Sequence, residues 1–168
     1  VLIIGNIPYY ITTPVIEKII DQRQYIQGAY IVIQEEVADR IVSSPGSKDY
    51  GSLSCFVQFY TKTEKLFRIK KNSFYPKPKV DSCLLKLEIP PEPQVKVGDE
   101  QLMFSIIRKA FLQRRKKILN SLSHGEFLSM NKDAWQDILG RCGVDVSKRP
   151  ENLALSDYAR ISDAVGQR

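Results

Sequence analysis

Apolar and polar residues alternate with different periods in the two halves of the chain. In the first half, Val1–Ile4 and Ala29–Ile33 are short aliphatic and β-branched runs without alternation. This pattern is typical of buried parallel strands. Thr13 and Pro14 predict the start of a helix whose apolar stripe consists of Ile16, Ile19 and Ile20.

The rest of this half adds a second helix and at least two strands. Residues 35–42 predict the helix, with Val37, Ile41 and Val42 directed inward, and residues 52–60 fit either a helix or a strand. Residues 63–69 and 84–89 predict strands on either side of a proline-broken loop. Strands that alternate with helices predict an α/β fold with a parallel sheet.

Pro90-Pro91-Glu92-Pro93 interrupts every period, so we expect a domain boundary there, with domains 1–92 and 93–168. Beyond it the apolar spacing is helical, which predicts an all-helical second domain. Ser156 is the expected cap of the last helix. The apolar positions that define these helices are Phe104, Ile107, Phe111, Ile118, Leu122, Trp135, Ile138, Leu139, Tyr158, Ile161 and Val165.

Composition narrows the possible functions. A net charge of +6 favours polyanionic partners. The three cysteines form no CxxC pair, which predicts reduced thiols in a cytoplasmic protein. With His124 as the only histidine, we expect no metal site and no Ser-His or Cys-His nucleophile. No apolar run is long enough for a membrane span. The first residue is Val1 rather than Met, so we expect the gene product to begin elsewhere.

Asn6-Ile7-Pro8-Tyr9, directly after the first strand, carries the clearest chemistry. An exocyclic adenine amine is a poor nucleophile because its lone pair is delocalised into the ring. The Asn6 side-chain oxygen and the Ile7 carbonyl could accept hydrogen bonds from that amine and direct its lone pair at a methyl donor. Tyr9 could stack on the flipped-out base. The alternative is a strand that simply ends in a proline turn.

A second candidate is the loop Asn72–Ser82, which two spaced prolines stiffen. Phe74 could close the other side of the base opposite Tyr9, and Lys77 and Lys79 are suited to phosphate. The alternative is a rigid connection with Phe74 in the core.

A third candidate is the basic run Arg108–Lys117. Projected at 100° per residue, Lys109, Gln113, Lys116 and Lys117 lie opposite the apolar stripe and are predicted RNA contacts, together with Arg114. Arg115 projects onto the apolar side, so we expect it to pair with a carboxylate or carbonyl at the domain junction. The alternative is a solvated helix face.

Seven blocks resemble one family in the same order along the chain: Asn6–Thr12, Gln34–Ile41, Pro45–Ser54, Phe74–Ser82, Ala110–Lys116, Asn120–Leu122 and Arg149–Ser156. The family is the ribosomal RNA small-subunit adenine-N6,N6-dimethyltransferases. The resemblance implies an α/β fold, the C-terminal half of a class I (Rossmann-like) S-adenosylmethionine-dependent methyltransferase sheet plus a small helical domain. The resemblance also implies the catalytic residues Asn6, Ile7, Pro8 and Tyr9, with Phe74 as the stacking residue.

The implied reaction is methyl transfer from S-adenosylmethionine to N6 of two adjacent adenosines near the 3′ end of small-subunit rRNA, in ribosome biogenesis. The implied partner is the immature small subunit, bound by a monomer. Three alternatives stay open: a large-subunit rRNA methyltransferase that confers antibiotic resistance, a non-catalytic ribosome-assembly factor, and a DNA adenine methyltransferase.

The chain departs from the family at the cofactor. The family binds S-adenosylmethionine mainly through a Gly-rich turn that this sequence does not contain, and Asn6 is the one cofactor contact that we expect. Of the family's strand order 3-2-1-4-5-7-6, the chain would supply 4-5-7-6, with the first strand left as an apolar, aggregation-prone edge. We therefore expect an N-terminally truncated, inactive fragment that binds S-adenosylmethionine weakly or not at all.

Overall fold

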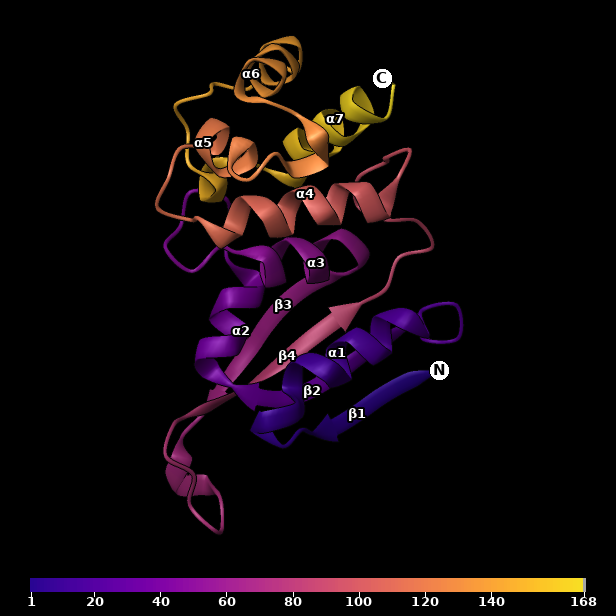
Figure 1. Cartoon of the computed structure of the whole chain (residues 1–168). Coiled ribbons are helices and arrows are strands. Elements are labelled where there is room, and N and C mark those ends of the chain that lie inside the picture. The colour runs from indigo at the N-terminus through magenta and orange to yellow at the C-terminus, as the bar shows by residue number, and fades with distance from the viewer. Residues whose placement is uncertain (168) are drawn as a thin grey trace. The chain divides into compact units, whose positions relative to one another are not determined.

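The structure is a computed structural model that describes residues 1–167, and these form two compact units (Figure 1). The sheet unit consists of Val1–Ser43 and Phe56–Gln94. The helical unit consists of Ser44–Cys55 and residues 95–167. The expected boundary after residue 92 lies close to the division after Gln94, but the sequence pattern did not associate Ser44–Cys55 with the later helices.

The sheet unit is built on four strands in the order β1-β2-β4-β3, which matches the expected 4-5-7-6. β1 pairs with β2 in parallel, whereas β4 is antiparallel to both β2 and β3. The prediction of a wholly parallel sheet is therefore wrong for β4. Residues 70–81 join β3 to β4 without an α-helix that crosses the sheet, and neighbouring strands joined in this way usually pair antiparallel. The strands are β1 Leu2–Asn6, β2 Gly28–Gln34, β3 Lys62–Ile69 and β4 Ser82–Glu88.

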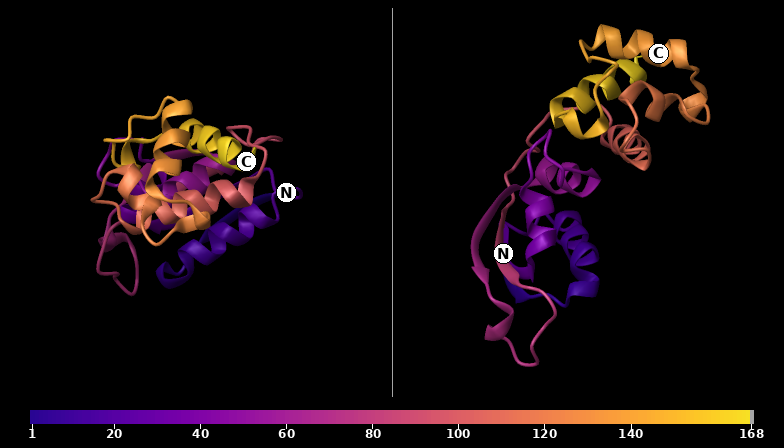
Figure 2. Two further views of the ribbon diagram at one scale, coloured as in Figure 1. Left: turned by 45° about the horizontal axis from the view of Figure 1, so that its top comes forward. Right: turned by 90° about the vertical axis from the view of Figure 1, so that its left-hand side faces the viewer.

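The helices α1 (Thr12–Asp21) and α2 (Glu35–Val42) cover one face of the sheet (Figure 2, right). The strand residues Ala29, Ile31 and Ile33 are fully buried beneath them. The stripe of α1 is buried as predicted, but this helix begins at Thr12, so Thr13 is not its N-cap. Residues 52–60 resolve as the helix α3 (Ser52–Tyr60), and the division between the units falls within it.

β1 is not the buried strand that its composition suggested. It lies at the edge of the described sheet and pairs only with β2, and its side chains are largely exposed, with Ile4 78% accessible. The expected apolar edge is thus confirmed for the described residues.

The helical unit contains α4 (Glu100–Leu112), α5 (Ile118–Ser123), α6 (Lys132–Arg141) and α7 (Leu155–Gly166). The side chains of Asp99 and Asn131 accept hydrogen bonds from the backbone N–H groups of Leu102 and Ala134, and so cap α4 and α6. Trp135, Ile138 and Leu139 are buried as predicted. Ser156 is not the cap of α7: Ala154 holds that position, and its N–H donates to Asp157. Short 3-10 helices occur at Tyr9–Ile11, Lys71–Ser73, Phe127–Ser129 and Pro150–Asn152.

Segment Ser44–Cys55 is held in the helical unit mainly through backbone groups. The Gly46 N–H donates to the Glu151 carbonyl at 2.6 Å, and the Arg114 guanidinium donates to the Lys48 carbonyl. Tyr50 is buried, and its ring makes a T-shaped contact with the Phe111 ring, with the two ring centroids 6.2 Å apart. Burial raises the pKa of the Cys55 thiol, which donates to the Tyr50 hydroxyl, to about 12, so this thiol stays protonated and unreactive near neutral pH.

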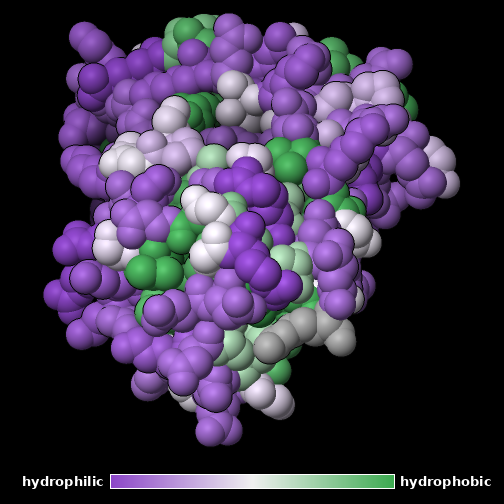
Figure 3. All heavy atoms as spheres, turned by 90° about the horizontal axis from the view of Figure 1, so that it is seen from above, coloured by the Kyte–Doolittle hydropathy of each residue, from purple (hydrophilic) through white to green (hydrophobic). Residues whose placement is uncertain are grey.

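On the face of the molecule seen from above, hydrophilic residues dominate, and hydrophobic ones lie in separate groups (Figure 3). Among residues 1–167, no helix has the length and hydrophobicity needed to cross a membrane.

Candidate functional site

Asn6-Ile7-Pro8-Tyr9 forms the turn at the carboxyl end of β1. Asn6 is the last residue of the strand and lies beside Val32 of β2. The Ile7 N–H donates to the Val32 carbonyl at 3.0 Å, which holds the turn against the sheet. The Pro8 carbonyl accepts from the Ile11 N–H at 3.1 Å. Within residues 1–167 no backbone N–H donates to the Ile7 carbonyl, so this oxygen stays available as an acceptor.

Tyr9 links this turn to a strand far along the chain. Its hydroxyl lies 2.7 Å from the Oγ atom of Ser82, the buried first residue of β4. The contact fixes the hydroxyl end of the Tyr9 ring and brings the first motif next to the end of the Asn72–Ser82 loop.

Asp81 anchors that loop at its base. One carboxylate oxygen accepts from the Lys71 N–H at 2.8 Å, and the other accepts from the Arg68 guanidinium. The Lys71 N–H, and after it Arg68, lower the pKa of the Asp81 carboxyl. The Asp81 carbonyl in turn accepts from the Glu35 N–H at 3.0 Å, which ties the loop to the start of α2.

The two motifs together line a cavity of about 300 Å³. One wall is Asn6, Ile7, Pro8 and Tyr9; the rest is Phe74, Tyr75, Pro76 and Pro78. Phe74 is half-buried there. The structure therefore brings together all five predicted catalytic residues, whereas Lys77 and Lys79 are exposed on the loop and do not line the cavity.

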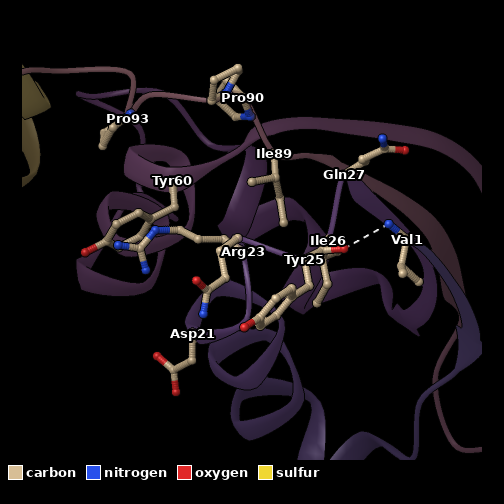
Figure 4. Close-up of a pocket in the computed structure, with 12 residues that line it drawn as sticks. Val1, Asp21, Arg23, Tyr25, Ile26, Gln27, Tyr60, Ile89, Pro90 and Pro93 are labelled. Atoms are coloured by element: carbon tan, nitrogen blue, oxygen red, sulfur yellow. Dashed lines mark hydrogen bonds between the residues drawn. The ribbon is translucent and has the colours of Figure 1, made fainter.

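A larger cavity of about 700 Å³ lies at the other end of the strands (Figure 4). Its lining includes Val1 and Gln27, which directly precede β1 and β2, and the Arg23 guanidinium lies 4.7 Å above the centre of the Tyr60 ring. Open α/β sheets bind ligands at the carboxyl ends of their strands. The smaller cavity is therefore the better candidate site despite its size.

The basic run of the helical unit does not form one helix. α4 ends at Leu112 and α5 begins at Ile118, so the projection that placed residues 109–118 on a single cylinder is wrong beyond Leu112. Lys109 is half-buried, with its Nζ atom 5.6 Å from the centre of the Phe127 ring. Gln113 is the C-cap residue of α4.

The structural arginine of this run is Arg114, not Arg115. The Nε atom of Arg114 lies 2.8 Å from a Glu151 carboxylate oxygen, and the same guanidinium binds the Lys48 carbonyl. Arg115 is exposed, as are Lys116 and Lys117. The expectation for Arg115 failed because the end of α4 changes the direction of every following side chain.

Lys148 and Arg149 are two basic residues that the sequence analysis did not predict as RNA contacts. Both are exposed, and the Ile118 N–H donates to the Lys148 carbonyl at 2.7 Å, next to Lys117. Lys148 and Lys117 both help to lower the pKa of Asp145, although the Ser147 N–H is the largest cause. We call Arg115, Lys116, Lys117, Lys148 and Arg149 the basic patch. A backbone contact between residues 30 apart has no sequence signature that could have revealed it.

Solved structures define the class of this fold. A crystal structure of a dimethyladenosine transferase from Plasmodium falciparum matches with a TM-score of 0.81 and 25% identity, over 95% of this chain and 64% of that one. The 23S rRNA methyltransferase ErmE shares the fold, with a TM-score of 0.68 and 22% identity, over 99% of this chain and 65% of that one. The chain is therefore an α/β protein with a methyltransferase fold.

Residues 1–163 match the family model described as ribosomal RNA adenine dimethylase, and the chain belongs to this family. The resemblance predicted from the sequence is thus confirmed. The chain is 40% identical over 168 residues to the ribosomal RNA small subunit methyltransferase A of Alkaliphilus metalliredigens, and 37% identical over 166 residues to that of Bacillus cytotoxicus. These matches include 100% and 98% of this chain, but only 58% and 57% of the length of the two relatives.

Proposed function

We propose that this chain acts in the methylation of adenosine N6 in small-subunit rRNA, and that the 300 Å³ cavity holds the target base. The observation that carries the proposal is that Asn6-Ile7-Pro8-Tyr9 and Phe74, 65 or more residues apart in the sequence, line one cavity at the carboxyl end of β1. The curated relatives are named for the small-subunit enzyme, which favours this substrate over the large-subunit alternative.

In the proposed mechanism, the base flips out of its stack into the cavity. The Asn6 side-chain oxygen and the Ile7 carbonyl accept hydrogen bonds from the exocyclic amine, which favours a more tetrahedral nitrogen with its lone pair directed outward. The rings of Tyr9 and Phe74 hold the base by stacking. The hydrogen bond between Tyr9 and Ser82 holds the Tyr9 ring in place before the base arrives, so the ring loses less conformational entropy when the base binds.

The methyl donor of this family is S-adenosylmethionine, but the cavity residues do not fit a complete site for it. No carboxylate lies among the residues that line the cavity, so it lacks an acidic partner for the ribose hydroxyls of a nucleoside. Asn6 is the one residue of the lining with a side-chain amide, and we propose that this amide contacts the cofactor as well as the target amine. We expect calorimetric titration of S-adenosylmethionine into the 168-residue chain to show no binding, and micromolar binding would contradict this assignment.

The proposed setting is the cytoplasm, with an immature small subunit as partner and the gene product that contains this chain as a monomer. The basic patch and the lysines of the β3–β4 loop suit rRNA phosphates, and the three cysteines are unpaired.

Asn6→Ala tests the catalytic assignment in the gene product that contains this sequence. We expect methylation of isolated small subunits to fall by at least about 100-fold, comparable to the loss of one oxyanion-hole donor. RNA affinity should persist, because the phosphate contacts are unchanged. Gln24→Ala is the matched control, an exposed amide of the same unit that lines the other cavity. Near-normal turnover in Asn6→Ala would contradict the role of Asn6. A wild-type gene product that binds rRNA without methylating it would instead favour the assembly-factor alternative.

A further inference from the structure

Two neighbouring aromatic residues on the β3–β4 loop differ sharply in burial. Phe74 is half-buried in the wall of the candidate cavity, whereas Tyr75 is fully exposed at the rim of the same cavity. The backbone at Phe74 is extended, with φ −116° and ψ 148°. In extended backbone, consecutive side chains point to opposite sides, so the two rings face different surroundings.

The exposure of Tyr75 alone would mean little, because single exposed apolar residues are common. Its surroundings distinguish it. Pro76 and Pro78 follow it and line the same cavity, and each fixes its own φ angle. The ring is therefore presented by a restricted backbone, which lowers the entropy cost of stacking another ring against it.

The same loop is electrostatically suited to a nucleic-acid strand. Lys70, Lys71, Lys77 and Lys79 are all exposed. Asp81 is the one acidic residue in positions 70–81, and Arg68 and the Lys71 N–H already engage its carboxylate. The loop thus offers positive charge on both sides of an exposed ring, a combination typical of single-strand binding surfaces.

We propose that Tyr75 is a second stacking platform, which holds the base of the nucleotide next to the target adenosine in the same strand. This inference rests on the proposed function, in which the target base occupies the cavity. A base that leaves its stack costs stacking energy with its neighbours. Tyr75 replaces the lost partner of the neighbouring base, while Lys77 and Lys79 contact the phosphates on either side. Adjacent aromatic residues thereby receive adjacent nucleotides.

The test measures binding of a fluorescein-labelled RNA of ten uridines with one central adenosine to the 168-residue chain, at low salt. In two further RNAs, the nucleotide on the 5′ or the 3′ side of the adenosine is an abasic ribose. A fourth RNA has an abasic ribose in place of the adenosine. For the wild-type chain we expect one abasic neighbour to weaken binding by about 5- to 150-fold, the range for one stacked base.

Tyr75→Ala should bind the intact RNA more weakly by a similar factor and lose its sensitivity to the abasic neighbour. Tyr75→Trp should keep both affinity and sensitivity. Tyr25→Ala is the matched control, because Tyr25 is also an exposed tyrosine of the sheet unit but lines the other cavity. Phe74→Ala should instead lose sensitivity to removal of the central adenine.

Two results would overturn the platform: no binding of the intact RNA at low salt, or sensitivity to the abasic neighbour that Tyr75→Ala leaves unchanged. If Phe74→Ala still loses its adenine sensitivity in the second case, the candidate cavity stands and only the platform fails. A Tyr75 effect without any Phe74 effect would support the platform and contradict the cavity as the site of the target base.

Discussion

At the scale of single residues, side-chain chemistry could be predicted better than side-chain direction. Asn6, Tyr9 and Phe74 were selected for their chemistry, and the structure places them in one cavity. Arg114 and Arg115 were separated only by an angular projection, and this projection assigned the structural role to the wrong neighbour. The chemistry of a side chain can be read from its identity, whereas its direction depends on where a helix ends. Here α4 ends at Leu112 without a glycine or proline to signal it.

Arg114→Ala and Arg115→Ala form a matched pair that separates these roles. Arg114 joins Glu151 and the Lys48 carbonyl, so we expect its loss to lower the free energy of unfolding by about 1 kcal/mol, discounted because the ion pair is partly exposed. Arg115→Ala should stay within about 0.5 kcal/mol of wild type, as for most surface changes. Urea unfolding followed by circular dichroism would measure both. Equal effects would contradict the assignment of Arg114 as the structural residue.

At the scale of elements, the β3–β4 loop shows how one carboxylate can organise a segment that has little regular structure. Asp81 joins Arg68 and the Lys71 N–H across the base of the loop, and its backbone carbonyl binds Glu35. The sequence identified this block as part of a family pattern but not the role of Asp81, because its partners lie 10 and 13 residues earlier and reach it only through strand pairing.

The lowered pKa of Asp81 makes this anchor sensitive to acid. A carboxyl whose pKa is lower in the folded than in the unfolded state adds stability above its unfolded pKa of about 4. That contribution is lost as the pH falls below this value and through the folded pKa. We therefore expect Asp81→Asn to reduce stability at pH 7 and to flatten the loss of stability between pH 5 and pH 2, roughly the range over which a depressed carboxylate titrates. Urea midpoints across this range, with the exposed Asp21→Asn as control, would check it. Parallel profiles of stability against pH for Asp81→Asn and wild type would contradict the assignment of the Asp81 carboxylate as the anchor of the loop.

The exposed edge strand β1 predicts association between copies of the 168-residue chain. Ile4 is 78% exposed on a strand that pairs with one neighbour in the described sheet, and exposed apolar edges promote association between chains. We expect light scattering to show concentration-dependent association of the 168-residue chain, and Ile4→Lys to reduce it. Val80→Lys adds the same charge at an exposed apolar position outside the strands and should have a smaller effect. Equal suppression by both variants would point to net charge rather than to the edge.

At the scale of the whole molecule, the strand order and the two classes of unit followed from the sequence, but the path of the chain between the units did not. The expected order 4-5-7-6 agrees with β1-β2-β4-β3. Segment Ser44–Cys55 joins the helical unit through carbonyls of Lys48 and Glu151, groups that every residue carries and no pattern distinguishes. The basic patch was missed in part for the same reason, since the Lys148 carbonyl brings it together.

The basic patch locates part of the net charge of +6 and so allows a specific prediction about the salt dependence of rRNA binding. Lys116→Glu with Lys148→Glu removes two exposed cations, whereas Lys109→Glu changes a half-buried lysine that lies over Phe127. If the patch contacts phosphates, the double variant should reduce the slope of log affinity for rRNA against log salt by about 1.5, because each contact contributes about 0.7 to 0.9. Lys109→Glu should leave that slope nearly unchanged and instead lower the thermal unfolding temperature, because its cation–π contact is lost. Fluorescence anisotropy over a series of salt concentrations would distinguish them. A reduced slope in Lys109→Glu alone would indicate that α4, rather than the basic patch, contacts RNA. An unchanged slope in both Lys109→Glu and the double variant would mean that these lysines are only solvated.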